Sequence, residues 1–399
     1  MSIPSNSQVH KHPSGDTVSQ IDVGHRDKEV RTSSGFTARL QSAMQEIVAV
    51  TYWFDPTPHP SPYPVTVRFS GHRVDVKGRL SAGDRFVQDE TIEEVVPGSG
   101  PISLTARVRT INPGSWVVTA HQLPSAHHAQ RQREQENVTP AAGQTDPIAR
   151  FWRRWAPSLE SVEQVETCMT PFARVPGIFP GIWAAMVTLG IAVALTLQSL
   201  VISGDHLAVG SWWAVSPGAI VVGIVGAKVW YVVLYRRDHL VNGWCIQGFI
   251  TGAILAAAIL LMILKVPAGV FLDATAPGLL FAMAVGRVGC FFAGCCGGPP
   301  TAARWGVWSS DQRVGARRIP TQLLESMLAL SLGSLVLVMV LRHGPMGGTL
   351  FVGALAAYTL VRQGILHLRA EPRKTRLGGL ATSALAVLVL IVAIVVLVR

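Results

Sequence analysis

The stretch that decides the fold is Gly286-Arg287-Val288-Gly289-Cys290-Phe291-Phe292-Ala293-Gly294-Cys295-Cys296-Gly297-Gly298, which closes an apolar run that begins near Pro277. An arginine this deep in an apolar run is costly in a membrane, so Arg287 is expected to have a function. The flanking glycines allow backbones to pack closely or the helix to end. Three of the five cysteines also lie in this stretch. The sequence therefore predicts that the working site is here.

Composition places the chain among membrane proteins. Only 15% of its 399 residues are charged, whereas soluble domains carry about 25%, and its mean hydropathy is +0.35. From residue 181 onward the apolar runs are long enough to cross about 30 Å of hydrocarbon. We predict seven spans, near 181–202, 213–235, 244–264, 274–294, 320–341, 348–368 and 378–398.

The residues before these spans have a different character. Residues 1–45 are polar, show no secretory signal and are predicted to be a disordered tail. Residues 46–120 alternate apolar and polar side chains between turn signals such as Pro97-Gly98-Ser99-Gly100, which predicts six or seven short strands in a small β-sandwich-like accessory domain. Residues 121–175 are predicted to be a polar linker and juxtamembrane segment, in which Phe151–Trp155 is an interfacial anchor.

The fold class predicted for the whole chain is therefore a polytopic α-helical membrane protein of about seven transmembrane helices, residues 176–399, with an N-terminal sheet domain. Basic residues gather in alternate loops, and the positive-inside rule places those loops and the N-terminus in the cytoplasm. The net charge of +10 favours an anionic lipid partner over nucleic acid.

Five motifs follow one another along the spans. They are Gly226-Ala227-Lys228-Val229-Trp230-Tyr231-Val232, Asn242-Gly243-Trp244-Cys245-Ile246-Gln247-Gly248, Gly286-Arg287-Val288-Gly289, Arg318-Ile319-Pro320-Thr321-Gln322-Leu323-Leu324-Glu325, and Tyr358-Thr359-Leu360-Val361-Arg362 with Arg369 seven residues later. In this order and spacing the chain resembles the prolipoprotein diacylglyceryl transferase family over about residues 178–399. The Gly-Arg-x-Gly stretch and Pro320-Thr321-Gln322-Leu323-x-Glu325 carry the resemblance most specifically.

The resemblance implies an enzyme that moves a diacylglyceryl group from phosphatidylglycerol to the lipobox cysteine thiol of a prolipoprotein, with glycerol phosphate as the leaving group. It implies no metal or organic cofactor, and it places the protein in a bacterial cell membrane with prolipoprotein signal peptides as partners. Guanidinium groups suit the anionic donor and the charge that develops on the leaving phosphate. The catalytic residues implied are Arg287, Arg362, Gln247 and Glu325, and the substrate-binding residues are Gln322, Gly289, Cys290, Gly298, Tyr358 and Arg369.

The chain departs from the family pattern at several polar positions. Gln247 stands where the family has a histidine base, Trp183 where it has a tyrosine, and Ile319 where it has the histidine of His-Pro. Cys290 and Cys295 replace an asparagine and a glutamate, and Leu366 replaces a glutamate. The resemblance also puts the arginine-bearing helix ends outside the cell, against the charge rule.

Three functions stay open at this point. The first is the transferase; the second is a catalytically silent lipid-binding or scaffold protein of the same fold. The third is a transporter that uses Cys290, Cys295 and Cys296, although no usual zinc spacing surrounds them and close packing of small side chains explains them more simply.

Overall fold

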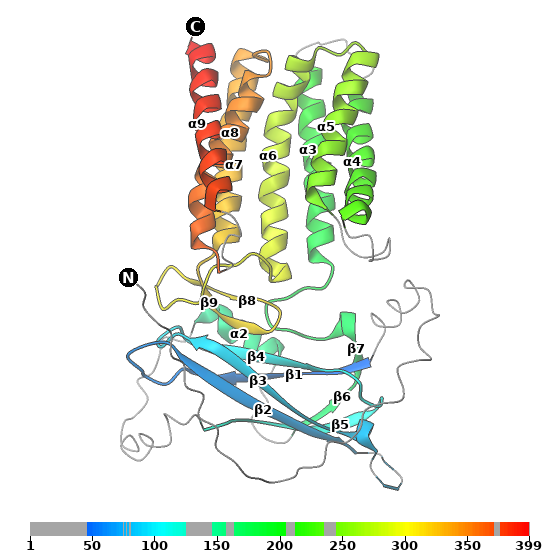
Figure 1. The fold of residues 1–399 in the computed structure, drawn as a ribbon, viewed down its shortest axis with the longest axis vertical. Helices are drawn as coiled ribbons and strands as arrows, with labels where there is room; N and C mark the ends of the chain where they lie inside the picture. The colour runs from blue at the N-terminus through cyan, green and yellow to red at the C-terminus, as the bar shows by residue number, and fades with distance from the viewer. Residues whose placement is uncertain are drawn as a thin grey trace, which may run out of the picture.

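The computed structural model describes residues 46–74, 76, 78–79, 81–124, 146–156, 163–204, 212–234, 245–370 and 376–398. It consists of a bundle of long helices that stands on a sheet-rich region, with the C-terminus at the far end of the bundle (Figure 1). The predicted disordered tail over residues 1–45 lies outside the described residues, and so do Asn242, Gly243 and Trp244 of the second motif.

Within the described residues, seven helices are long and apolar enough to cross a membrane, which confirms the predicted number of spans. They are α3 (Ile182–Gly204), α4 (Trp212–Leu234), α5 (Ile246–Ile263), α6 (Ala268–Ala293), α7 (Thr321–His343), α8 (Thr349–Ile365) and α9 (Arg376–Val398). Helix α6 is central and packs on α3, α7 and α8, while α4 pairs with α5 and α8 with α9. The helix that carries Arg287 is therefore the one most enclosed by protein.

Small residues let α3 and α6 approach closely. A Cβ atom added to Gly278 would lie 2.6 Å from the Ala194 carbonyl oxygen, and one added to Gly190 would lie 3.0 Å from the Ala282 carbonyl oxygen. Such contacts need glycine, because membrane helices gain their association from close backbone packing.

At the end of the bundle far from the sheets, a buried carboxylate joins α6 to α8. Asp273 on α6 has no exposed surface, and it accepts backbone N–H groups of Met346 at 2.6 Å, Gly348 at 2.8 Å and Phe351 at 3.0 Å. Met346 and Gly348 lie just before α8 and Phe351 lies in its first turn, where a negative charge also suits the helix dipole. Asp273 therefore holds the start of α8 against α6.

The sheet-rich region contains two antiparallel sheets whose inward residues form one hydrophobic core. Its strands are β1 (Glu46–Phe54), β2 (Tyr63–Arg73), β3 (Arg85–Val95), β4 (Ile102–Val108), β5 (Ser115–Gln122), β6 (Glu163–Glu166), β7 (Cys168–Met169), β8 (Val307–Ser310) and β9 (Val314–Arg318). One sheet has the order β7-β1-β4-β9-β8 and the other β3-β2-β5-β6. The turn signals were placed correctly, but the described part of residues 46–122 holds five strands instead of six or seven, because β2 and β3 each run for 11 residues.

The β8–β9 hairpin belongs to the segment between α6 and α7, yet it extends the N-terminal sheet. Strand β9 pairs with β4, with Gly315 opposite Ser103 and Val314 opposite Leu104. Trp308 on β8 is buried, stacks on Trp53 of β1 with ring centroids 5.4 Å apart and donates its Nε1–H to the Pro101 carbonyl at 3.0 Å. The sheet region and the membrane domain are thus joined by main-chain pairing and a buried aromatic pair.

A short helix lies between the sheets and the bundle. Helix α2 (Pro147–Trp155) begins at Asp146, whose side chain accepts the Ile148 N–H at 3.0 Å. The Asp146 carboxylate also pairs with Arg317 of β9 at 3.1 Å. Trp152 is buried against the Trp53–Trp308 pair, whereas Phe151 is 60% exposed. The predicted interfacial anchor is therefore a helix with one face built into the sheet region.

Several basic side chains at the sheet end are tied to carboxylates. Arg313 pairs with Glu90 at 3.1 Å and Arg318 with Asp311 at 2.7 Å. These arginines stabilise the hairpin and its contact with β3, so their presence in that loop has a structural cause besides the positive-inside rule. The sheet region, this basic loop and the C-terminal end of α6 all lie at one end of the bundle (Figure 1). An experiment that shows which side of the membrane one of them faces therefore gives the side for all three.

Candidate functional site

Three arginines converge on one carboxylate at the sheet end of the bundle. Glu325 on α7 has no exposed surface. Its Oε2 lies 2.7 Å from Arg287 Nε of α6 and 3.5 Å from Arg362 Nε of α8. Its Oε1 accepts a hydrogen bond of 2.6 Å from Arg369 Nη2. We call these four residues the arginine cluster; with three cations and one anion it carries two positive charges.

Helix ends place these side chains. Arg287 lies six residues before Ala293, the last residue of α6, and therefore about 9 Å below the helix end at 1.5 Å per residue. Gly294 ends α6 in the left-handed conformation, with φ of 69°, and turns the chain away toward the hairpin. Glu325 is in the second turn of α7, and Arg369 follows the 3-10 turn Leu366–Leu368 at the end of α8. Three helix ends thus bring the cluster together.

Tyr358 and the glycines beside Arg287 shape the space around the cluster. Tyr358 is 4% exposed, and its hydroxyl has no hydrogen-bond partner among the described residues. A Cβ atom on Gly289 would lie 2.8 Å from Met186 Cβ of α3, so glycine is needed there. A Cβ atom on Gly286 would meet nothing within 4 Å. The structure therefore leaves open space on one side of Arg287 and packs the other side tightly.

Gln322 and Gly298 hold the segment after α6 against α7 and α8. Gln322 Nε2 donates to the Cys295 carbonyl at 2.8 Å, and the neighbouring Thr321 hydroxyl donates to the Cys296 carbonyl at 2.9 Å. A Cβ atom on Gly298 would lie 2.6 Å from the Ile319 carbonyl oxygen. Both residues were predicted to bind substrate, and the structure gives them main-chain contacts that keep the loop in place.

The three cysteines of the opening stretch form one group of free thiols. Cys290 is buried, and Cys295 Sγ lies 3.6 Å from the Cys290 carbonyl oxygen. Hydrogen bonds with the thiols of Cys290 and Cys296, together with burial, raise the pKa of Cys295 above its ordinary value. A thiol with a raised pKa is a poor nucleophile near neutral pH. Within the described residues, no group of three or more His, Cys, Asp or Glu side chains is arranged to hold a metal ion.

Some predicted site residues do not join this group. Gln247 is exposed in the first turn of α5, and α5 packs on α4 instead of the helices that carry the cluster. Trp183 on α3 approaches Gly289 through its backbone, with its side chain 51% exposed. The structure brings together Arg287, Glu325, Arg362, Arg369 and Tyr358, with Gln322, Gly289, Gly298 and Cys290 around them.

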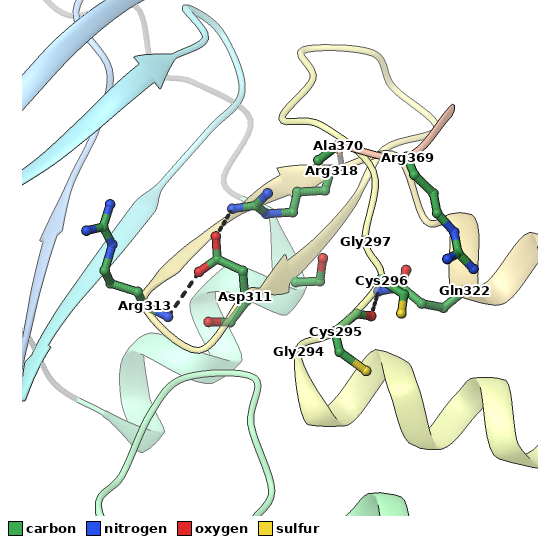
Figure 2. A pocket seen from close by; sticks show the side chains of 12 residues that line it. Gly294, Cys295, Cys296, Gly297, Asp311, Arg313, Arg318, Gln322, Arg369 and Ala370 are labelled. Carbon is green, nitrogen blue, oxygen red and sulfur yellow. Dashed lines mark hydrogen bonds and ion pairs between the residues drawn. The ribbon is translucent and has the colours of Figure 1, made fainter. Parts of the chain in front are cut away.

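A cavity of about 510 Å³ lies between the hairpin and the ends of α6 and α7, and sequence reasoning missed it. Figure 2 shows Arg318, Arg313, Asp311, Gln322 and Arg369 around it. We call it the hairpin cavity. Arg369 lines it and also donates to Glu325, so the cavity adjoins the arginine cluster. The only sequence signal was the density of arginine between residues 313 and 318, which charge counting treats as topological.

Such an arrangement is suited to binding a phosphate group. Guanidinium groups match phosphate oxygens in pairs, and positive charge held in a partly water-excluded site stabilises charge that develops during group transfer. Fold and site together define a multi-pass membrane protein with a cluster of arginines around one buried carboxylate at the end of its central helix.

Comparison with known proteins identifies the family. Residues 176–399 match the family model of prolipoprotein diacylglyceryl transferases, and the chain belongs to this family. It is 29% identical over 235 residues to a phosphatidylglycerol--prolipoprotein diacylglyceryl transferase of Frankia alni, a match that covers 54% of this chain and 62% of the relative. Proteins of the same name from Clostridium perfringens and Clostridium tetani are 30% and 27% identical, with 41% and 48% of this chain and 68% and 81% of the relatives covered. The relatives' names are those of transferases, as the resemblance predicted.

Proposed function

We propose that this chain transfers a diacylglyceryl group from phosphatidylglycerol to the lipobox cysteine thiol of a prolipoprotein in a bacterial plasma membrane. The observation that carries the proposal is the convergence of Arg287, Arg362 and Arg369 on the buried Glu325. One carboxylate orders three guanidinium groups and neutralises only one of them. The remaining positive charge is available to an anionic lipid.

The residues then have distinct roles in the transfer. The acceptor sulfur forms a bond to the glyceryl carbon, the bond from that carbon to the phosphate oxygen breaks, and glycerol phosphate leaves with the electron pair and takes up the proton of the thiol. Arg287 and Arg362 hold the phosphate and stabilise the charge that grows on it. Glu325 positions the arginines, and Tyr358 offers a buried hydroxyl beside them.

The direct test is transfer to a lipobox peptide in membranes that contain Arg287→Gln or Arg287→Lys. Either change removes the planar, two-donor geometry at the phosphate, and we expect a rate loss of about a hundredfold or more. Arg304→Gln, an exposed arginine of the α6–α7 segment, is the matched control and should keep full activity. Unchanged transfer by both Arg287 variants would overturn the assignment of this site.

A second candidate function is a catalytically silent lipid-binding or scaffold protein. The observation in its favour is that Gln247, which stands at the family's histidine position, is exposed on α5, so the chain offers no base there. Complementation of a strain without its own transferase separates the two functions. Growth supports the enzyme, and correct insertion without growth supports the scaffold.

We also infer that the two sheets form a β-sandwich that acts as an accessory domain over the site. Their shared core, which includes Val67, Phe69, Leu104 and Trp116, supports this interpretation. The hairpin pairing between β9 and β4 supports a role at the site itself, since the same hairpin lines the cavity beside Arg369.

A further inference from the structure

The hairpin cavity lies at the ends of the membrane-spanning helices α6 and α7. Helix α6 ends at Ala293, and the cavity is lined by the residues that follow, by the hairpin and by the segment after α8. Its side chains are mainly polar or charged: Arg313, Arg318, Arg369, Asp311, Gln322 and the thiol residue Cys296. Cavities of a few hundred cubic ångström are the usual size for small-molecule sites, and this lining suits a small, water-soluble ligand.

The charges of the cavity favour an anion. Arg318 is 8% exposed, its Nη2 donates to Asp311 at 2.7 Å, and its Nε has no hydrogen-bond partner among the described residues. Arg313 pairs with Glu90 at the outer rim. Arg313 and Arg318 are each paired with one carboxylate, so the two surplus positive charges belong to the arginine cluster, which the cavity reaches through Arg369.

The cavity is connected to the place of the chemistry by shared residues. Arg369 lines the cavity and donates to Glu325 through its Nη2. Gln322 also lines it and lies one helical turn before Glu325 on α7. The cavity and the arginine cluster are therefore neighbours that share Arg369.

The outer wall of the cavity depends on the sheet region. Ser309, Ser310 and Arg318 of the wall belong to the hairpin, and β9 of that hairpin is held by β4. Strand β4 lies outside residues 176–399, the part that matches the family model. The sheet region of this chain thus holds in place, through β4, the hairpin that forms this wall.

We propose that the hairpin cavity binds the glycerophosphate group as the freed product of transfer, with Arg318 as its main recognition residue. The inference rests on the proposed function, in which glycerol phosphate is the leaving group. The same chemistry is found in the lipid head group, but the position of the cavity beyond Ala293 and its polar lining favour the free product.

The test is calorimetric binding of glycerol phosphate, with glycerol as the uncharged comparison, to the full-length protein in phosphatidylcholine nanodiscs. We expect binding of glycerol phosphate alone, at least tenfold weaker binding in Arg318→Gln, and intermediate binding in Arg318→Lys, which keeps the positive charge but loses the paired donors. Asp311→Asn keeps the acceptor for the Arg313 and Val314 N–H groups and removes the competing charge, so it should bind several-fold more tightly. Arg304→Gln is the control.

Equal affinity in wild type, Arg318→Gln and Asp311→Asn would overturn the inference. If Arg318→Gln does not fold, Asp311→Asn decides alone, because a purely structural cavity would not gain affinity. A second experiment uses nanodiscs that contain phosphatidylglycerol. If the lipid displaces glycerol phosphate and this displacement depends on Arg318, the cavity binds the lipid head group, and the proposal that it binds the free product is refuted.

Binding needs no acceptor, so this result is independent of transfer. Arg318-dependent binding without any transfer would refute the proposed function and leave the cavity's ligand class standing. Transfer without glycerol phosphate binding would refute only the inference.

Discussion

Replacing Glu325 with glutamine probes the arginine cluster most sharply. Glutamine keeps the size and one acceptor oxygen but removes the negative charge that three guanidinium groups share. Because Glu325 has no exposed surface, water cannot take over its role. The variant therefore leaves three positive charges close together with no carboxylate between them.

The magnitude follows from the geometry. Breaking a buried ion pair by removing one partner costs about 3–5 kcal/mol. Arg287 and Arg369 lie 2.7 and 2.6 Å from the carboxylate with side chains 19% and 16% exposed, whereas Arg362 at 3.5 Å is 36% exposed and contributes less. At roughly 2–4 °C per kcal/mol, we expect the Tm to fall by about 10 °C and transfer to be lost.

The assay is thermal unfolding in detergent, read by tryptophan fluorescence, with Glu163→Gln on the exposed face of β6 as the control. Phosphate adds a diagnostic arm. An anion that binds only the folded state at ten times its Kd stabilises it by about 1.4 kcal/mol, so phosphate should raise the Tm of Glu325→Gln more than chloride of equal ionic strength does.

Two results would refute this reasoning. A Tm of Glu325→Gln within the error of wild type would mean that the carboxylate does not hold the arginines. If phosphate raised the Tm of wild type and of Glu325→Gln by the same amount, the charge removed from Glu325 would not face an anion site.

Three further predictions concern stability and the site's surroundings. Asp273→Ala leaves three N–H groups at the start of α8 without acceptors, at a cost of about 1–3 kcal/mol each. Thermal unfolding should therefore show a loss of stability of about 3 kcal/mol or more, and Asp273→Asn should lose less. Equal Tm values for wild type and Asp273→Ala would contradict the role of Asp273 in holding α8 against α6. Gly298→Ala, whose Cβ atom would lie 2.6 Å from the Ile319 carbonyl oxygen, should reduce both Tm and transfer, while Gly286→Ala, with nothing within 4 Å, should change neither. Hydrogen bonds from Asn112 and Ser81, with Arg73 nearby, lower the pKa of Asp84 from 3.8 to about 2. The ionised carboxylate therefore stabilises the folded protein above about pH 4, and this stabilisation is lost as the pH falls through about 2. The Tm difference between wild type and Asp84→Asn should vanish over that interval, and a difference that stays constant would show that the charge of Asp84 does not contribute.

Much of the membrane domain could be predicted from the sequence because its signals are local. A span requires a run of apolar residues of fixed length, and the observed helices match the predicted segments closely, with α6 beginning earlier, at Ala268. Arg287 could be singled out since an arginine within such a run is costly. The five strands of residues 46–122 follow turn signals that were visible in advance.

The remaining features depend on contacts between distant residues. Strand β9 of the hairpin is too short to be predicted from its own sequence. It is a strand because it pairs with β4. In the sequence, Asp273 is an isolated acidic residue in an apolar helix. The backbone N–H groups that its carboxylate accepts belong to residues 73 to 78 positions further along the chain. Gln247 was grouped with the arginines by motif order, whereas helix packing leaves it exposed.

The sequence by itself determined that this protein has seven segments long and apolar enough to cross a membrane and that it belongs to the prolipoprotein diacylglyceryl transferase family, because span length and motif order are properties of the linear sequence. Only the tertiary structure decided which charges meet. Arg369 and Glu325 are 44 residues apart and form a hydrogen bond, and the hairpin that builds the cavity beside them is held by a sheet from the other half of the molecule. The physical reason is that charge interactions act over a few ångström, and only packing sets those distances.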